Sequence, residues 1–211
     1  GPVTADGLAA LEAMTDFAVR HRLARLSVDR GYGAELVHMD EAPTVTLGGV
    51  PVALPSAAFL QATPDGERAL VDAVQLATSG ARRIADLFAG LGTFALPLST
   101  RAYVTAIDAA GSAIEALGSA ARRFQRPIVA QHRDLFRAPL DVKELGKFDA
   151  VVLDPPRAGA RAQAEELARS SVPRIAMVSC NPNSFARDAK TLVDGGYKLT
   201  RLWPVRQFRW S

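Results

Sequence analysis

The spacing of apolar residues changes along the chain and, beyond residue 58, predicts alternating strands and helices. Runs rich in Val, Ile, Leu and Ala predict strands buried on both faces, at residues 83–88, 103–108, 128–132, 149–154, 175–180 and 198–205. Helical spacing predicts helices near residues 65–78, 93–99, 112–124, 160–170 and 184–194. This alternation indicates an α/β fold with a mostly parallel sheet, right-handed crossovers and helices on both faces.

The first 58 residues follow a different pattern. Apolar side chains recur at helical spacing from near Ala5, at Leu8, Leu11, Met14 and Phe17. Short β-like runs follow at residues 24–28, 44–47 and 50–54, separated by glycines and prolines. We therefore expect a small α+β appendage over residues 1–58 and a second domain over residues 59–211.

The composition narrows the class of protein. Hydrophobic residues make up 48% of the 211 positions and charged residues 22%, so we expect a packed core rather than disorder. No apolar run is long enough for a transmembrane helix and no signal peptide is recognisable, so we expect a cytoplasmic protein with no membrane partner. The net charge of +3 and the pI near 9.3 permit a nucleic-acid partner. We expect a monomer.

The residues that usually bind metal ions are sparse. Cys180 is the only cysteine, so neither an internal disulfide nor a structural zinc or iron–sulfur site built on several cysteines is expected. His21, His38 and His132 are scattered along the chain and indicate no metal site. We therefore expect chemistry that uses no metal.

Glycines follow the first predicted strand of the second domain, in the segment DLFAGLGTFA at residues 86–95. In open parallel sheets, ligands bind at the carboxyl ends of the strands, where glycines let the backbone approach a ligand closely. Gly90 and Gly92 fit a G-x-G-x-x-A pattern, and Asp108 ends the next strand, where an acid can bind both hydroxyls of a ribose. This pattern favours NAD and S-adenosylmethionine equally, and a purely structural turn is a third interpretation.

Asp134 follows the third predicted strand of the second domain. A carboxylate at this position can reach an adenine amine of a bound cofactor. It can equally cap the N-terminus of a short helix that begins at Leu135. Both interpretations stay open at this point.

The segment DPPR, at residues 154–157, follows the fourth strand. Each proline fixes its own φ angle and lacks a backbone donor, so the pair ends the strand and stiffens the loop. Asp154 is then held at the ligand-binding edge, where a rigid polar loop can grip the edge of a flipped nucleic-acid base. An NAD-dependent enzyme has no need of this element, and a structural loop is the simpler alternative.

Cys180 ends the fifth predicted strand, within the segment SCNP at residues 179–182. A cysteine that packs as a small hydrophobe is the simpler interpretation. Here, however, the residue directly precedes a predicted helix, whose N-terminus favours an anion such as a thiolate. A thiolate that adds to carbon 6 of uracil places electron density on carbon 5, which can then attack the methyl group of a sulfonium. We therefore favour Cys180 as the nucleophile of such a reaction.

With these motifs, the chain resembles the RNA uracil-5 methyltransferase family, whose bacterial members modify rRNA and tRNA. The resemblance runs from about Leu26 to the end of the chain. Its marks are FLQ (59–61), DLFAGLGTF (86–94), DPPRAG (154–159), VSCNP (178–182) and PVRQF (204–208). The pair DPPRAG and SCNP, in this order, is highly specific. A Rossmann-like class I methyltransferase sheet is the fold that this resemblance implies.

The resemblance also implies roles for single residues. S-adenosylmethionine would be the cofactor, and its pocket would be lined by Gln61, Phe88, Gly90, Thr93, Asp108 and Asp154, with Asp134 as a further candidate. Thr93 replaces an asparagine that some family members carry. Cys180 and Asp154 would be catalytic, and Asp154 and Arg157 would bind the RNA substrate. The segments FLQ, DLFAG and DPPRAG look closer to the rRNA branch, so 23S rRNA is favoured over tRNA.

The chain also departs from the family pattern. The family's proton acceptor is a glutamate in a His-Val-Glu segment after the QF tail, and neither it nor the last strand of the sheet lies within these 211 residues. The family's N-terminal RNA-binding barrel and four-cysteine cluster are not found either. We expect a truncated catalytic domain that binds the cofactor and turns over poorly. Asp188 and Glu115 are interpreted as solvated positions on helices, not as replacement bases.

Other functions remain as alternatives. An RNA adenine or guanine N-methyltransferase also uses a proline-rich loop, although it usually needs an aromatic residue where this chain has Arg157. A non-catalytic, methyltransferase-like RNA-binding module would explain the missing base. An NAD-dependent oxidoreductase leaves DPPR and SCNP unexplained. The aromatic residues Trp203, Phe208 and Trp210 either stack on RNA bases or pack at the edge of the sheet.

Overall fold

The computed structural model describes residues 7–56 and 58–207. Its centre is a five-stranded parallel sheet in the order β7-β6-β5-β8-β9. The strands are β5 (Arg83–Leu87), β6 (Tyr103–Asp108), β7 (Ile128–His132), β8 (Ala150–Leu153) and β9 (Ile175–Met177). The strand order reverses beside β5, because the chain builds outward to β7 and then returns to β8. This arrangement confirms the predicted α/β, Rossmann-like fold.

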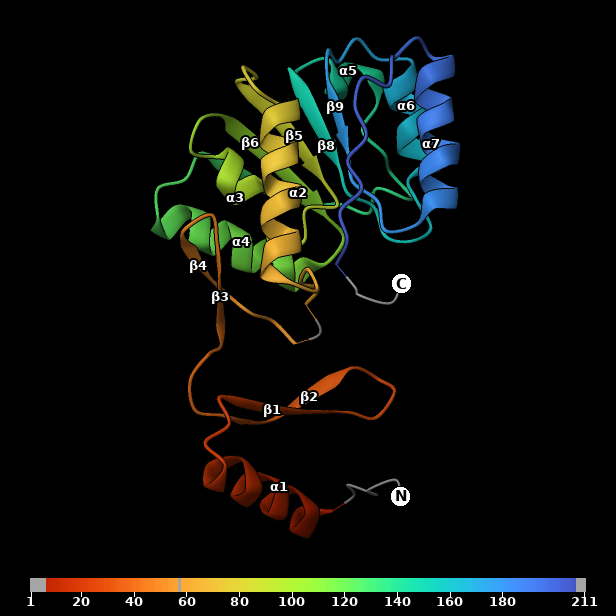
Figure 1. The fold of residues 1–211 in the computed structure, drawn as a ribbon. Helices are drawn as coiled ribbons and strands as arrows, with labels where there is room; N and C mark the ends of the chain where they lie inside the picture. The colour runs from red at the N-terminus through yellow and green to blue at the C-terminus, as the bar shows by residue number, and fades with distance from the viewer. Residues whose placement is uncertain (1–6, 57, 208–211) are drawn as a thin grey trace.

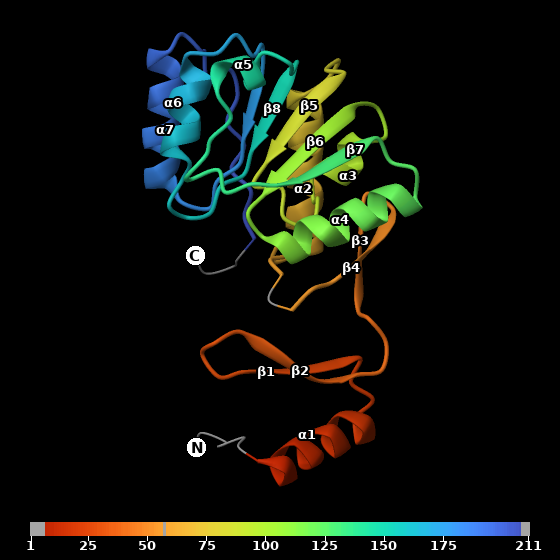
Figure 2. The same ribbon diagram turned by 180° about the vertical axis from the view of Figure 1, so that it is seen from behind.

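Helices cover both faces of the sheet (Figures 1 and 2). One face carries α2 (Pro64–Ala77), α3 (Ala95–Leu98) and α4 (Gly111–Arg123), and the other carries α5 (Val142–Leu145), α6 (Arg161–Ala168) and α7 (Pro182–Asp194). Side chains alternate between the two cores, because successive residues of a strand point to opposite faces. Ile84 and Val152 belong to the core beneath α4, whereas Leu87 and Leu153 belong to the core beneath α6 and α7.

The N-terminal part contains helix α1 (Leu8–Arg20), the hairpin β1 (Arg25–Asp29) and β2 (Ala34–Met39), and the hairpin β3 (Thr44–Leu47) and β4 (Val50–Ala53). The helix and the strands agree with the predicted α+β character, although strand β2 was not predicted. The predicted start of the helix near Ala5 lies outside the described residues. The β3–β4 hairpin buries Leu47, Val50 and Val52 in the same core as α4. The appendage therefore contributes apolar contacts to the second domain. The boundary at residue 58 stays a prediction.

Two predicted strands differ in the structure. Residues 198–205 form no strand, and they make no backbone–backbone hydrogen bond within the described part of the chain. A strand needs an adjacent strand that forms hydrogen bonds with its backbone N–H and C=O groups, and Pro204 has no backbone N–H to donate. The strand predicted at 175–180 ends at Met177, because the Ser179 hydroxyl accepts a hydrogen bond from the backbone N–H of Asn181 at 3.2 Å and so favours a turn.

None of the helices in the described part of the chain has the length and apolar surface that crossing a membrane requires.

The loop after β5 packs tightly against α4 at one glycine. Gly92 has a φ of +91°, and a Cβ placed on it would lie 2.6 Å from Cδ1 of Leu117, which is fully buried. Gly90 also has a positive φ, +52°, but a Cβ there would meet no atom within 4 Å. Gly92 is therefore required both by conformation and by space, whereas Gly90 is required by conformation alone.

We predict that Gly92→Ala destabilises the fold more than Gly90→Ala. Both changes strain a left-handed backbone, but only the first also forces a buried leucine to move, which adds roughly 1–3 kcal/mol. Urea unfolding followed by circular dichroism measures the two free energies of unfolding. If both variants lose the same free energy of unfolding, the Leu117 side chain moves without an energetic penalty and the prediction is wrong.

Candidate active site

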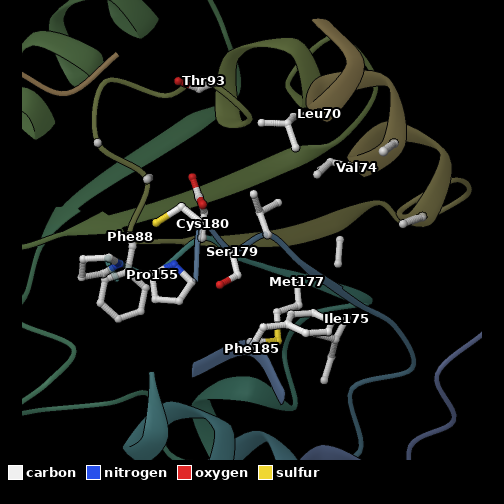
Figure 3. Close-up of a pocket in the computed structure, with 18 of the residues that line it drawn as sticks. Leu70, Val74, Phe88, Thr93, Pro155, Ile175, Met177, Ser179, Cys180 and Phe185 are labelled. Carbon is white, nitrogen blue, oxygen red and sulfur yellow. The ribbon is translucent and has the colours of Figure 1, made fainter. Parts of the chain in front are cut away.

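A large pocket opens at the carboxyl ends of the sheet strands and extends between α2, α7 and the C-terminal tail (Figure 3). Its volume of about 2110 Å³ exceeds the roughly 300–1,000 Å³ of a typical small-molecule site, so it has room for more than one ligand. All the site residues predicted from the sequence line it: Gln61, Phe88, Gly90, Thr93, Asp108, Asp134, Asp154, Arg157 and Cys180. The structure thus brings them together, while their roles stay predictions.

The loop after β5 is held by Asp108, at the end of β6. One carboxylate oxygen of Asp108 accepts a hydrogen bond from the Gly90 backbone N–H at 2.8 Å, and the other accepts one from Ala110 N–H at 2.7 Å. These bonds fix the glycine loop against the neighbouring strand. Each carboxylate oxygen keeps further lone pairs that a ligand donor can use.

Phe88 adopts a strained backbone conformation at the same loop. Its φ of +64° is unusual for a residue with a bulky side chain and costs on the order of 1–3 kcal/mol. Its ring lies 5.4 Å from the ring of Phe136, centroid to centroid, in a tilted arrangement. The two rings form an aromatic wall on the loops that follow β5 and β7.

Three carboxylates meet at this edge because of the strand register. Asp86 of β5 pairs with Ala106 of β6 and with Val152 of β8. Asp108 and Asp154 lie two residues beyond those partners, and residues two apart point to the same face of a sheet. Three adjacent strands therefore direct a carboxylate to one side of the sheet.

This arrangement raises the pKa of two of the carboxylates. Burial raises the pKa of Asp86 well above its usual range, and the nearby Asp154 and Asp108 raise it further. Burial, followed by the charge of Asp108, raises the pKa of Asp154 to about 7. The backbone N–H of Ala95 opposes the rise at Asp86, but neither oxygen of Asp86 has a hydrogen-bond partner of normal geometry among the described residues.

Asp86 was not singled out in the sequence analysis. It lies within DLFAG, is fully buried beneath this edge of the sheet, and is not among the residues that line the pocket. A fully buried carboxylate without a partner is costly, so a compensating cation or donor is expected nearby. An acidic residue in an otherwise apolar strand was the signal that could have identified it.

Asp134 has a structural role in the observed loop. One of its oxygens accepts hydrogen bonds from the backbone N–H groups of Phe136 at 2.9 Å and Arg137 at 3.3 Å. These bonds stabilise a turn rather than a helix, so the predicted helix cap is corrected to a turn cap. Asp134 still lines the pocket, and its other oxygen lies 3.5 Å from Nε of Arg137.

Cys180 lies in the turn between β9 and α7, where its side chain is exposed to the pocket. The prediction that it ends a strand was wrong by three residues, because β9 ends at Met177. It precedes α7 as predicted, and Asn181 caps that helix by accepting a hydrogen bond from Asn183 N–H at 3.0 Å. The cysteine is therefore accessible, which contradicts the alternative of a buried hydrophobe. Figure 3 shows it among the pocket residues with Phe88 and Pro155.

Gln61 is joined to the C-terminal tail. Its side-chain oxygen accepts a hydrogen bond from Nε2 of Gln207 at 2.9 Å, and Oε1 of Gln207 accepts one from Ala62 N–H at 3.0 Å. These two bonds hold residue 207 against the loop before α2. The tail thus forms one wall of the pocket although it is not a strand.

Trp203 lies on this tail and is 43% exposed. The Cζ atom of Arg201 lies over its ring, 5.8 Å from the ring centroid. It is therefore not part of the core. Phe208 and Trp210, which were considered with it, lie outside the described residues.

Asp188 differs from our interpretation. It is fully buried, not a solvated position on a helix. It forms an ion pair with Arg187 at 2.7 Å and accepts a hydrogen bond from Ala160 N–H at 2.7 Å. Glu115 is exposed, as interpreted. Within the described residues, no group of three or more histidine, cysteine, aspartate or glutamate side chains could hold a metal ion.

We predict that Asp154→Asn stabilises the protein above neutral pH. The folded-state pKa of about 7 lies above the usual 3.8, so the folded protein retains a proton that the unfolded chain has lost. The stability of the wild type therefore falls as pH rises from about 4 to about 7, and the uncharged asparagine removes this loss. Urea unfolding at pH 5 and pH 8 measures the difference.

Asp149→Asn is the matched control for this experiment. Backbone N–H groups of Arg83 and Arg82 lower the pKa of Asp149, so removing its charge should lower the stability at pH 8. A pH dependence that is the same in wild type and Asp154→Asn would contradict the assignment of Asp154.

Comparison with solved structures supports the fold. The tRNA (uracil-54, C5)-methyltransferase of Pyrococcus abyssi, solved in complex with S-adenosyl-L-homocysteine, is 30% identical, with a TM-score of 0.66 over 80% of this chain and 42% of that chain. The 16S rRNA N2 G1207 methyltransferase of Thermus thermophilus, solved with AdoMet and guanosine, is 22% identical with a TM-score of 0.51 over 87% of this chain and 57% of that chain, and shows the fold alone.

Comparison with curated proteins gives relatives with RNA methyltransferase names. An uncharacterized RNA methyltransferase of Zymomonas mobilis is 51% identical over 97% of this chain and 51% of its own length. The 23S rRNA (uracil(1939)-C(5))-methyltransferase of Chromohalobacter salexigens is 38% identical over 83% of this chain and 36% of its own length. The chain thus spans about half the length, or less, of these relatives.

A sequence profile of a protein family matches most of the chain. The profile described as tRNA (uracil-5-)-methyltransferase matches residues 54–211, which include the glycine loop, DPPRAG and SCNP. The match covers most of the chain, and it agrees with the sheet and with the motifs gathered in the pocket. The chain belongs to the tRNA (uracil-5-)-methyltransferase family.

Proposed function

We propose that residues 59–211 form the catalytic domain of an enzyme that transfers a methyl group from S-adenosylmethionine to carbon 5 of a uridine in RNA. The observation that carries the proposal is the exposed Cys180 in the same pocket as Asp154 and the glycine loop. Family membership supports it. Because the chain spans about half of its relatives' length, the activity is proposed for the longer protein of which this domain would be a part.

The pocket suits a cofactor that carries positive charge. S-adenosylmethionine has a sulfonium and an ammonium group, and the edge of the sheet has three carboxylates. Of these, Asp86 is buried and has no hydrogen-bond partner of normal geometry within residues 7–56 and 58–207. A cation near these groups offsets the cost of their burial. When bound, the cofactor supplies an electrophilic methyl group. We propose that it is held by Gln61, Phe88, Gly90, Thr93, Asp108, Asp134 and Asp154.

Cys180 is proposed to act by covalent catalysis. Its thiolate sulfur would form a bond to carbon 6 of uracil, and the electrons of the carbon 5–carbon 6 double bond would move onto carbon 5 and oxygen 4. Carbon 5 would then form a bond to the methyl group that the bound cofactor supplies, while the bond between that methyl group and the cofactor's sulfonium sulfur breaks and leaves a neutral thioether. A general base would take up the carbon-5 proton, and the electrons of that carbon–hydrogen bond would restore the double bond and expel the cysteine as a thiolate.

Asp154 and Arg157 are proposed to bind the target base and its backbone. With a pKa of about 7, Asp154 is present in both protonation states at neutral pH, so it can accept or donate a hydrogen bond at the edge of the base. Arg157 is exposed at the rim of the pocket, where a guanidinium can bind the base or a phosphate.

We propose 23S rRNA rather than tRNA as the substrate. The support is the 38% identity to an enzyme named for 23S rRNA, against 30% to the solved enzyme named for tRNA. Parallel reactions with rRNA fragments and T-loop fragments distinguish the two RNA classes.

Asp108→Asn should weaken S-adenosylmethionine binding. A single amide oxygen cannot replace both carboxylate oxygens, so either the Gly90 or the Ala110 hydrogen bond is lost together with the negative charge. A hydrogen bond from a ribose hydroxyl of the cofactor to the charged carboxylate would be worth about 1.5–3 kcal/mol, so its loss should raise the Kd by about 10-fold or more in isothermal titration calorimetry. Asp141→Asn, at the N-cap of α5, is the control and should leave the Kd unchanged. Equal affinity of Asp108→Asn and wild type would exclude this role for Asp108.

Cys180→Ala should abolish covalent capture of RNA that carries 5-fluorouridine. Fluorine at carbon 5 prevents the final proton loss, so the adduct accumulates and is visible by denaturing gel and mass spectrometry. The wild type should form it only when S-adenosylmethionine is present. An adduct that persists in Cys180→Ala, or none in a wild type that binds both ligands, would reject the uracil-5 mechanism and favour an N-methyltransferase or a binding module.

A further inference from the structure

The DPPRAG loop and the residue after it are attached to α7 and its N-cap by three hydrogen bonds. Nδ2 of Asn181 donates to the carbonyl oxygen of Arg157 at 2.9 Å. Nη2 of Arg187 donates to the carbonyl oxygen of Ala158 at 2.9 Å. Oδ2 of Asp188 accepts from Ala160 N–H at 2.7 Å. We call Asn181, Arg187 and Asp188 the α7 clamp.

A buried charge lies at the centre of this clamp. Asp188 is fully buried, and its other oxygen accepts a hydrogen bond from Nε of Arg187 at 2.7 Å. Removing either partner leaves a buried charge or an unpaired backbone group, so the pair and the loop are stable only together. The Arg187 guanidinium is thereby oriented toward the loop.

The loop has no space to move closer to the helix. Gly159 has a φ of +79°, and a Cβ on it would lie 2.4 Å from Nη2 of Arg187 and 2.5 Å from Oδ2 of Asp188. The backbone of the loop therefore lies in direct contact with the ion pair.

The clamp joins the two elements that carry the reacting groups. Asn181 directly follows Cys180 in the chain. The loop residues that the α7 clamp holds follow Asp154 and the two prolines. We propose that Arg187 and Asp188 are positioning residues, which fix the DPPRAG loop against α7 and so set the placement of Cys180 relative to Asp154 and Arg157. This proposal rests on the proposed function of Cys180. Misplacement of reacting groups by about 1 Å can slow a reaction about 100-fold, so such a clamp can matter without touching the substrate.

The test uses Asp188→Ala, which removes both contacts, and Asp188→Asn, which retains an acceptor for Ala160 N–H but loses the charge. Asp194→Asn is the matched control, because Asp194 lies on the same helix in an exposed ion pair with Lys190, with its side chain 62% exposed. Four quantities are measured: capture of 5-fluorouridine RNA, the S-adenosylmethionine Kd, alkylation of Cys180 by iodoacetamide, and hydrogen exchange of residues 154–160. Alkylation is specific, because Cys180 is the only cysteine.

We expect Asp188→Ala to slow capture by about 100-fold and to speed hydrogen exchange in the loop, with the cofactor Kd and the alkylation rate unchanged. Asp188→Asn should be intermediate, and Asp194→Asn should match the wild type.

Three outcomes would overturn the proposal. The first is undiminished capture in Asp188→Ala despite faster loop exchange, and the second is loop exchange that does not change. In the third outcome, both Asp188 variants lose capture and also show faster hydrogen exchange in β5 and weaker cofactor binding. This result would indicate general destabilisation and would also reject the proposal. If the wild type itself forms no adduct, the proposed function fails, and loop exchange alone then decides whether the clamp holds the loop.

Discussion

The burial of negative charge at one edge of the sheet is the constraint on which this site depends. Parallel pairing aligns β5, β6 and β8 so that Asp86, Asp108 and Asp154 point to the same side. Like charges and burial both disfavour ionisation, which is why the pKa values of Asp86 and Asp154 are raised. Burial of the apolar side chains of the same strands in two cores offsets this cost.

Strained backbone and a buried carboxyl group occur together at the end of β5 and in the loop that follows it. Phe88 has a positive φ, Gly92 has no space for a side chain, and Asp86 has no hydrogen-bond partner of normal geometry in the described part of the chain. All three lie within one loop and the strand before it. Such features lower stability and are retained at sites that bind ligands. The surrounding helices hold them in place. In the same way, the ion pair between the buried Asp188 and the partly exposed Arg187 holds a loop that two prolines have already stiffened.

Most of the site could be predicted because short motifs follow strands in this fold. A parallel sheet brings the carboxyl ends of its strands to one edge, so DLFAG, Asp108, DPPR and SCNP had to meet once the strands were recognised. The strand predicted at 198–205 was wrong for a complementary reason. Apolar residues predict a strand only if a neighbour offers its backbone, and here the segment instead forms a wall of the pocket and is anchored through Gln207.

The sequence by itself determined the α/β fold, the order of most of its elements and the motif residues that meet in the pocket, because hydrophobic periodicity and strand-end motifs are local properties. Only the tertiary structure decided which carboxylates are buried, where β9 ends, and that Asp188 faces the DPPRAG loop rather than solvent. These properties depend on contacts between segments distant in sequence, such as Ala160 with Asp188 and Gln61 with Gln207. Burial and long-range hydrogen bonds carry no local signal in the chain, so they become visible only when the chain is folded.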